Sequence, residues 1–357
     1  DTVKNGNLQS DDTPFVFSET LLREAARHSD LKYCFPTAGA ALANENAIKI
    51  CYQKHAPASR VIAFQDCFMG RTVTMCQIGD SAAARVGVPL STQIDYMPFY
   101  DAVEAARVGV AAHIDAHVKL LETFFHRYPA QHACFIFELV QGEGGFNTAP
   151  TEYFRALMEC CRAHGVAVWD DEIQSFGRTT NMFAYETMGV GDLVDIMTVG
   201  KMTQACATLY TEKYNPKPGL LSGTFTDASV AFSVGNRLLE RLRDGDYYGE
   251  EGRIAAHHAA FKAQVEALAA RRPDWFPANE RVPAITGGIG GMMRFTPFGG
   301  DKAKVMKACR TAFDEGVVLF YCGHDPYHIR MLPPLGVMRL EDWPRVFECV
   351  ERGLAKV

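Results

Sequence analysis

Short apolar runs alternate with helical stretches along the first two-thirds of the chain. Runs of about four to eight apolar residues predict buried strands, whereas apolar residues repeating every three or four positions predict helices. The strand-like runs are RVIAF, ACFIFELV, VAVWDDE and LVDIMTVG. In HIDAHVKLLETFF, one helical face carries Ile114, Val118, Leu121 and Phe125. Strands buried on both faces and separated by helices predict an α/β fold with a mostly parallel sheet.

Two helices are predicted near the ends of this region, one from an N-cap residue and one from the spacing of its apolar residues. SETLLREAARH is predicted to be a helix that begins with Ser18 as its N-cap. Much further along, Val230, Val234, Leu238 and Leu242 are spaced as one apolar face of a long helix.

The pattern changes after about Thr226. A second long helix is expected over about 248–271, followed by the strand GGIGGMMRF and a helix from Lys302 to Glu315. The strands VVLF and YHIRML and a closing helix complete the chain. This order predicts a smaller α+β domain, so the expected domains are 1–245 and 246–357.

Composition limits the classes of function. The chain has 357 residues, 48% of them hydrophobic, and a net charge of −6, which disfavours a nucleic-acid-binding surface. No apolar segment approaches the roughly 20 residues of a membrane helix. Eleven cysteines are scattered without a CxxC pair, which favours reduced thiols in a cytoplasmic enzyme. Cys160 and Cys161 are adjacent on a predicted helix and point to different faces, so no metal site is expected.

The stretch DIMTVGKMTQACATL places Lys201 directly after an apolar strand and Gly200. Such a lysine can bind a phosphate, form a salt bridge or react with a carbonyl. A Walker phosphate loop requires a glycine where this chain has Asp195, and a serine or threonine where it has Met202. The phosphate-loop interpretation therefore fails, while a structural salt bridge remains open.

Other strand ends carry unusual side chains. In a parallel sheet, ligands collect at the carboxyl ends of the strands. VAVWDDE ends in three acids, FELVQGEGG is acidic and glycine-rich, and FPTAGAALANE turns through Gly39 into a helix whose N–H groups can bind an anion. A lysine, a carboxylate and an anion-binding helix start are the groups that a pyridoxal phosphate site requires.

These segments resemble the class III aminotransferases of the fold type I pyridoxal phosphate enzymes over almost the whole chain. DEIQSFGRTTNMFAYETMGV is similar to the family signature, and DIMTVGK to its strand before the cofactor lysine. GAALANENAIK and GKMTQACA are most similar to the lysine ε-aminotransferase branch. The resemblance implies a large domain at 1–245 that binds pyridoxal 5'-phosphate, a small C-terminal domain at 246–357, and a homodimer with shared active sites.

The resemblance also implies roles for individual residues. Lys201 is expected to hold the cofactor covalently and to move the substrate proton, and Asp171 to pair with the pyridine nitrogen. The remaining expected cofactor contacts are Ala40 and Ala41 at the phosphate, Phe68 on the ring, Gln174 near the ring hydroxyl with Glu172 behind it, and Thr224 at the phosphate of the neighbouring subunit. No metal ion is expected.

On the substrate side, Arg330 in HIRMLPPL is expected to bind a carboxylate. Glu143 in QGEGG is expected to pair with Arg330 when no carboxylate is present. Simpler interpretations stay open: Phe68 as a core residue, Arg330 as a structural bridge, and Glu143 as an anchor of its turn. Two departures from the family pattern are Met69, where histidine is usual, and an N-terminal segment that is expected to be short or incomplete before Gly39.

The implied reaction moves an amino group from an amine or ω-amino acid, with L-lysine as one candidate donor, to a keto acid such as 2-oxoglutarate. Alternatives on the same scaffold are an aminomutase or another ω-transaminase. A Schiff-base lyase that uses Lys201 without a cofactor, and a binding protein without catalysis, belong to other classes. Neither explains why an acid and an anion-binding helix start accompany the lysine.

Overall fold

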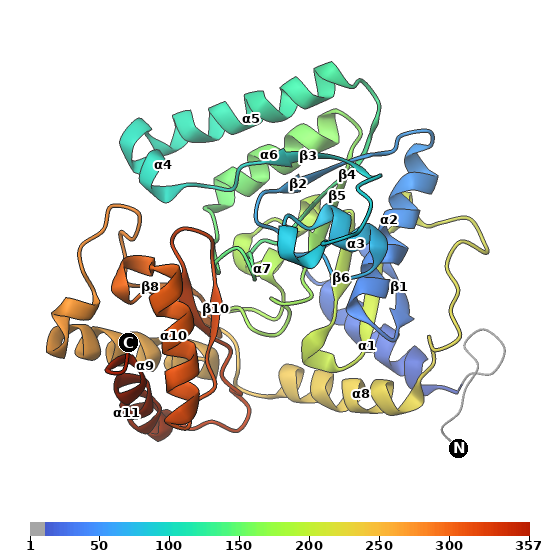
Figure 1. Cartoon of the computed structure of the whole chain (residues 1–357). Coiled ribbons are helices and arrows are strands. Elements are labelled where there is room, and N and C mark those ends of the chain that lie inside the picture. Colours follow the sequence, from blue (N-terminus) through green and yellow to red (C-terminus); the bar gives the residue numbers. More distant parts are fainter. Residues whose placement is uncertain (1–10) are drawn as a thin grey trace. The chain divides into compact units, whose positions relative to one another are not determined.

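The computed structural model describes residues 11–357, which form two compact units (Figure 1). Unit 1 extends to Leu139 and also contains Ala149–Gly177 and Phe183–Gly245. Unit 2 contains Asp246–Val357 together with two short segments, Val140–Thr148 and Arg178–Met182. Within residues 11–357, no helix combines the length and the apolar character that crossing a membrane requires.

Unit 1 contains a seven-stranded sheet in the order β1-β7-β6-β5-β4-β2-β3. All pairs from β6 to β3 are parallel, and only β7 runs antiparallel to both of its neighbours. The predicted, mostly parallel sheet is therefore confirmed. The strands are β1 (Leu31–Thr37), β2 (Arg60–Phe64), β3 (Gln93–Met97), β4 (His132–Phe137), β5 (Ala167–Asp171), β6 (Ile196–Val199) and β7 (Cys206–Thr211).

Helices cover both faces of this sheet because its strands are apolar on both sides. In β2, Val61 and Ala63 belong to the same core cluster as residues of α2. The ring of Phe64 faces the other way and stacks on Tyr153 of α6 at 6.2 Å. The helices of unit 1 are α1 (Thr13–Ala25), α2 (Ala40–His55), α3 (Val73–Ile78), α4 (Ala102–Val108), α5 (Val110–Arg127), α6 (Thr151–Ala163), α7 (Ala184–Met188) and α8 (Ser229–Asp244).

Two helices of unit 1 differ from expectation. Helix α1 begins at Thr13, because Pro14 in its first turn has a φ that suits a helix start, and Ser18 therefore lies inside the helix. In α8, Phe232 and Leu239 are buried, and the ring of Phe232 contacts α1. Val230 and Val234 are 63% and 43% exposed. The predicted stripe thus starts on a face of α8 that unit 1 leaves uncovered.

Unit 2 contains an antiparallel sheet in the order β10-β11-β9-β8. The expected single strand GGIGGMMRF is instead a hairpin of β8 and β9, because Gly290 adopts a φ of 58° at the turn. Its elements are β8 (Thr286–Ile289), β9 (Met292–Phe295), β10 (Phe320–Cys322), β11 (His328–Met331), α9 (Arg253–Arg271), α10 (Lys302–Asp314) and α11 (Trp343–Leu354).

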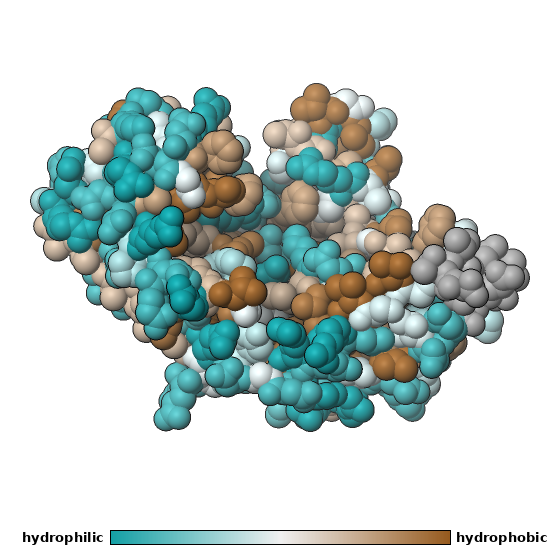
Figure 2. Space-filling view, turned by 90° about the horizontal axis from the view of Figure 1, so that it is seen from below, coloured by the Kyte–Doolittle hydropathy of each residue, from teal (hydrophilic) through white to brown (hydrophobic). Residues whose placement is uncertain are grey.

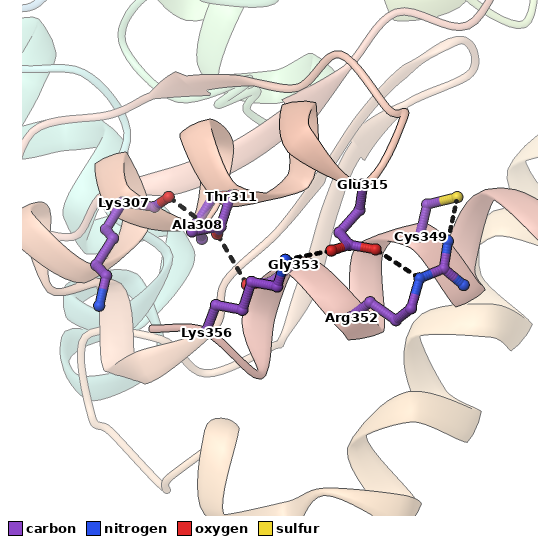
Figure 3. A network of polar contacts seen from close by, with 8 residues as sticks. All are labelled: Lys307, Ala308, Thr311, Glu315, Cys349, Arg352, Gly353 and Lys356. Carbon is purple, nitrogen blue, oxygen red and sulfur yellow. Dashed lines mark hydrogen bonds and ion pairs between the residues drawn. The ribbon is translucent and has the colours of Figure 1, made fainter.

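Helices α10 and α11 are held together by the polar contacts shown in Figure 3. The Thr311 hydroxyl donates to the Gly353 carbonyl at 2.8 Å. Glu315 accepts from Arg352 at 2.6 Å and also pairs with Lys356. A side chain at position 353 would lie 2.7 Å from the Cα of Ala312, so glycine allows this close approach.

Candidate active site at the carboxyl edge of the sheet

Two neighbouring strands of unit 1 end in the acid and the lysine singled out in the sequence. Asp171 is the last residue of β5, and it pairs in register with Thr198 of β6. Strand β6 ends one residue later and leads through Gly200 to Lys201, the first residue of a short 3-10 helix. Lys201 has a φ of 50°, a left-handed conformation that is uncommon for a non-glycine residue and concentrates at functional sites.

The Asp171 carboxylate is buried and firmly oriented. It is 4% exposed, and its oxygens accept from Asn44 Nδ2 at 2.7 Å and from the Ile173 N–H at 3.0 Å. Burial raises the pKa of Asp171 to about 6, while the two N–H donors and the charge of Lys201 act in the opposite direction. Asp171 is therefore mainly ionised at neutral pH and lies within electrostatic range of Lys201.

The two adjacent acids have surroundings that differ from those of Asp171. Glu172 accepts from the N–H groups of Ala184 and Tyr185 at 2.8 and 2.9 Å and so fixes the start of α7. Asp170 is fully buried, and burial together with Glu172 raises its pKa well above the usual range. Burial therefore favours the uncharged form of Asp170.

The start of α2 lies against the lysine loop. A side chain at Gly200 would come within 3.2 Å of the Ala40 Cβ and 2.9 Å of the Cys206 sulfur, so only glycine permits this approach. Helix α2 has Gly39 as its N-cap, without a capping side chain and without an acid in its first turn. The first N–H groups of a helix have no partner within it, so those of Ala40 and Ala41 can bind an anion beside Lys201.

The remaining predicted cofactor residues occupy loops of unit 1. Phe68 is half-buried after β2, and its N–H donates to Glu138 Oε2 at 3.2 Å. Gln174 is buried three residues beyond Asp171, and Thr224 is exposed between β7 and α8. Met69 is buried, and its carbonyl accepts from Asn44 at 2.8 Å.

Sequence reasoning missed Asn44, which orients Asp171. The signal for it was a polar residue on the buried face of the helix that follows Gly39. Its amide reaches both Asp171 and the Met69 carbonyl and so connects α2, β5 and the loop after β2.

Glu143 and Arg330 meet within unit 2. Arg330 Nη2 donates to Glu143 Oε1 at 2.7 Å, and Nη1 donates to the Gly142 carbonyl at 3.2 Å. The Arg330 side chain is 14% exposed and that of Glu143 is 40% exposed. The backbone carbonyl of Glu143 accepts from Gly323 at 2.8 Å, so the turn is held independently of the Glu143 side chain.

The groups of unit 1 fit pyridoxal 5'-phosphate on chemical grounds. An amine can bind the aldehyde, a buried carboxylate can neutralise a protonated ring nitrogen, and a helix start without a cap can receive the phosphate. All three lie around Gly200 and the end of β5. Asn44 and the Ile173 N–H hold the Asp171 carboxylate, and the Gln204 side chain donates to the Lys201 carbonyl.

Comparison with known proteins supports this interpretation. Residues 5–351 match the family model described as aminotransferase class-III. A diaminobutyrate–2-oxoglutarate transaminase of Streptomyces anulatus is 28% identical, with 90% of this chain and 74% of that protein covered. An uncharacterised aminotransferase of Sinorhizobium fredii is 27% identical, with 89% and 68% covered. The structure of a lysine aminotransferase from M. tuberculosis superposes with a TM-score of 0.82 at 22% identity, over 97% and 80% of the chains, which shows a shared fold.

Proposed function

We propose which residues carry out catalysis in this chain, which belongs to the class-III aminotransferases and is therefore an enzyme dependent on pyridoxal 5'-phosphate. It moves an amino group from an amine or ω-amino acid donor to a keto acid. The observation that carries the assignment of residues is the buried Asp171 carboxylate within electrostatic range of Lys201, at the ends of two paired strands.

In this proposal, Lys201 holds the cofactor aldehyde and Asp171 faces the ring nitrogen. Ala40 and Ala41 bind the phosphate through their N–H groups, and Phe68 and Gln174 contact the ring. When bound, the cofactor supplies an electron sink and carries the amino group between the two half-reactions. The Lys201 amine, once released from the cofactor, moves the substrate proton. The left-handed backbone conformation of Lys201 sets the direction in which its side chain leaves the chain.

Two further assignments extend this site. Thr224 follows β7 in an exposed position, consistent with binding a phosphate in a neighbouring subunit. Asn44 acts as a positioning residue, because its amide holds the Asp171 carboxylate. These contacts keep Asp171 oriented whether or not the cofactor is bound.

The ion pair between Arg330 and Glu143 supports a substrate switch. A transaminase must accept an uncharged terminal carbon in one half-reaction and an α-carboxylate in the other. An unpaired, buried arginine would be costly in the first case, about 1–3 kcal/mol or more. Glu143 pairs with Arg330 while no carboxylate is present and leaves when 2-oxoglutarate or glutamate arrives. Its greater exposure and its separately held backbone make this movement possible.

The names of the relatives suggest which substrates to consider first. Relatives named as diaminobutyrate and lysine transaminases act on donors with two amino groups, and the former use 2-oxoglutarate. We infer a terminal amine of an amino acid as the donor, with L-lysine and 2,4-diaminobutyrate as the first candidates, and 2-oxoglutarate as the acceptor. An aminomutase remains the second candidate, since it would use the same residues.

An exposed apolar surface supports a homodimer. Phe15 and Val16 of α1 and Val230 and Val234 of α8 are 62, 46, 63 and 43% exposed. Figure 2 shows apolar residues gathering on the face seen from below, the side along which α8 runs in Figure 1. Helices α1 and α8 pack together, and a second copy of the chain would cover these exposed apolar side chains. Eleven free cysteines favour the cytoplasm.

A panel of single half-reactions tests the donor assignment. The cofactor-loaded enzyme is mixed with L-lysine, ornithine, 2,4-diaminobutyrate, 4-aminobutyrate or a simple amine, and the absorption change from the aldehyde to the amine form is followed. Conversion with one or more terminal amines, reversed by 2-oxoglutarate, is expected. Product that retains its amino group at a new carbon, without a keto acid, would indicate the aminomutase instead.

Two variants test the switch in the same assay. Arg330→Ala should slow the glutamate half-reaction about 100-fold while sparing the terminal amine. Glu143→Ala should reduce discrimination between the two kinds of donor. Equal slowing of both half-reactions in both variants would show that the pair is only structural.

A further inference from the structure

A cluster of potential metal ligands lies between α5 and α6, outside the carboxyl edge of the sheet. A carboxylate oxygen of Glu122, the thiol of Cys160 and a ring nitrogen of His164 all lie within 4.8 Å of one another. Glu122 belongs to α5, Cys160 to α6, and His164 is the C-cap of α6. The two helices pack against each other, so the cluster joins neighbouring elements.

The geometry points to a zinc site that clamps α5 to α6, and we propose that Glu122, Cys160 and His164 bind one Zn²⁺ there, with His126 as the fourth ligand. The ring of His126 lies 6.0 Å from that of His164. Glu122 and His126 are four residues apart on α5, and Cys160 and His164 are four apart at the end of α6. Each pair therefore lies on one face of a helical turn, as chelating pairs do.

Three of the four ligand atoms are already grouped, whereas the His126 side chain must turn toward them. Zinc bonds of about 2.0–2.3 Å place tetrahedral ligand atoms roughly 3.3–3.7 Å apart, which is within the 4.8 Å limit that the Glu122, Cys160 and His164 ligand atoms satisfy. The His164 ring is already oriented by stacking on Phe125 at 4.5 Å. A set of one carboxylate, two imidazoles and one thiolate suits Zn²⁺ better than Mg²⁺ or Ca²⁺, which prefer oxygen ligands.

The local electrostatics also favour a cation. All four residues lie near the carboxyl ends of α5 and α6, where the helix dipoles carry partial negative charge.

The position indicates a structural role. Helix α5 leads into the start of β4, and α6 leads into the start of β5, so the cluster lies at the edge where these strands begin. Asp171 lies at the opposite end of β5. The adjacent Cys161 is buried and outside the cluster, so the partners of Cys160 come from across the helix pair. This proposal replaces the expectation of no metal.

The test uses the cofactor-loaded enzyme after dialysis against a chelator. Zn²⁺ binding is measured at pH 8 by equilibrium dialysis with metal analysis, and Co²⁺ is used as a spectroscopic probe. The variants are Cys160→Ser, His164→Asn and His126→Ala. Cys349→Ser is the matched control, because Cys349 is also a half-buried helical cysteine but lies in unit 2.

One Zn²⁺ per chain is expected, with affinity reduced at least about 100-fold by Cys160→Ser and His164→Asn and unchanged by Cys349→Ser. Visible Co²⁺ bands typical of four-coordinate cobalt should disappear in the same two variants. Zn²⁺ at 100 times its Kd should raise the Tm by about 3–6 °C in the wild type and not in Cys160→Ser. Transaminase activity of Cys160→Ser should stay unchanged. Binding below one ion per chain, or full binding by Cys160→Ser, would overturn the proposal.

Discussion

Burying the Asp171 carboxylate costs free energy, and the contacts within the protein only partly offset it. Burial raises its pKa to about 6, although two N–H donors and Lys201 favour the charged form. A positively charged group beside it would stabilise the carboxylate further. A protonated ring nitrogen would be such a group, so in the proposed site one contact would both stabilise the Asp171 carboxylate and keep the cofactor ring protonated.

Asp171→Asn should therefore retain cofactor and lose turnover by about 100-fold or more, because an amide cannot pair by charge with a protonated ring nitrogen. Steady-state kinetics and the cofactor spectrum measure the two effects separately. Asp170→Asn is the matched control, since burial favours the uncharged form of Asp170. If the control lost as much turnover as Asp171→Asn with its cofactor retained, Asp170 would be the residue at the ring.

At the scale of elements, the start of α2 is the proposed anion site. Gly39 provides the turn without a competing side chain, and Gly200 lets the lysine loop approach Ala40. Two segments 160 residues apart in the chain are thereby brought together. The proposed phosphate contacts use backbone N–H groups, so most side-chain substitutions would leave them intact.

Ala40→Pro tests these N–H groups directly. Proline is well tolerated at the first position of a helix, yet it removes the N–H that the phosphate needs. Loss of one hydrogen bond to a charged group, about 1.5–3 kcal/mol, should weaken cofactor affinity about 10- to 100-fold. Ala102→Pro makes the same change at the first position of α4 and should leave affinity unchanged. Unchanged affinity in a folded Ala40→Pro protein would place the phosphate elsewhere.

The sequence predicted those elements whose residue pattern reflects burial, and missed those that depend on contacts between distant residues. The strands β4, β5 and β6 were predicted because continuous apolar runs directly reflect burial on both faces. The hairpin of β8 and β9 was missed, since whether Gly290 extends a strand or turns depends on its tertiary contacts. Asp171 and Lys201 were found as polar residues at strand ends, whereas Asn44 was missed because its partner lies 127 residues away.

For the whole molecule, the exposed apolar side chains of α1 and α8 are the observation that supports the proposed homodimer. Sequence periodicity identified Val230 and Val234 as a face, but not whether that face packs inside the chain or against another copy. In the structure, Phe232 and Leu239 satisfy the internal contacts of α8. The remaining apolar residues fit a self-association surface.

Val230→Glu should disrupt the dimer, because it would bury a charge without a partner at the interface. Sedimentation velocity is expected to show a shift to monomer at micromolar concentration, with weaker cofactor affinity if Thr224 serves the neighbouring subunit. Val337→Glu, at a position 78% exposed in unit 2, is the control and should remain dimeric. A wild-type monomer with full cofactor affinity would contradict the dimer proposal.

The central claim is that this aminotransferase binds its cofactor covalently through Lys201. The most direct measurement is borohydride reduction of the cofactor-loaded enzyme, followed by peptide mapping of the modified lysine. The account predicts one modified lysine per chain, at Lys201, and no labelling of Lys201→Ala. Labelling at Lys213 or Lys217, both exposed beyond the end of β7, would contradict it.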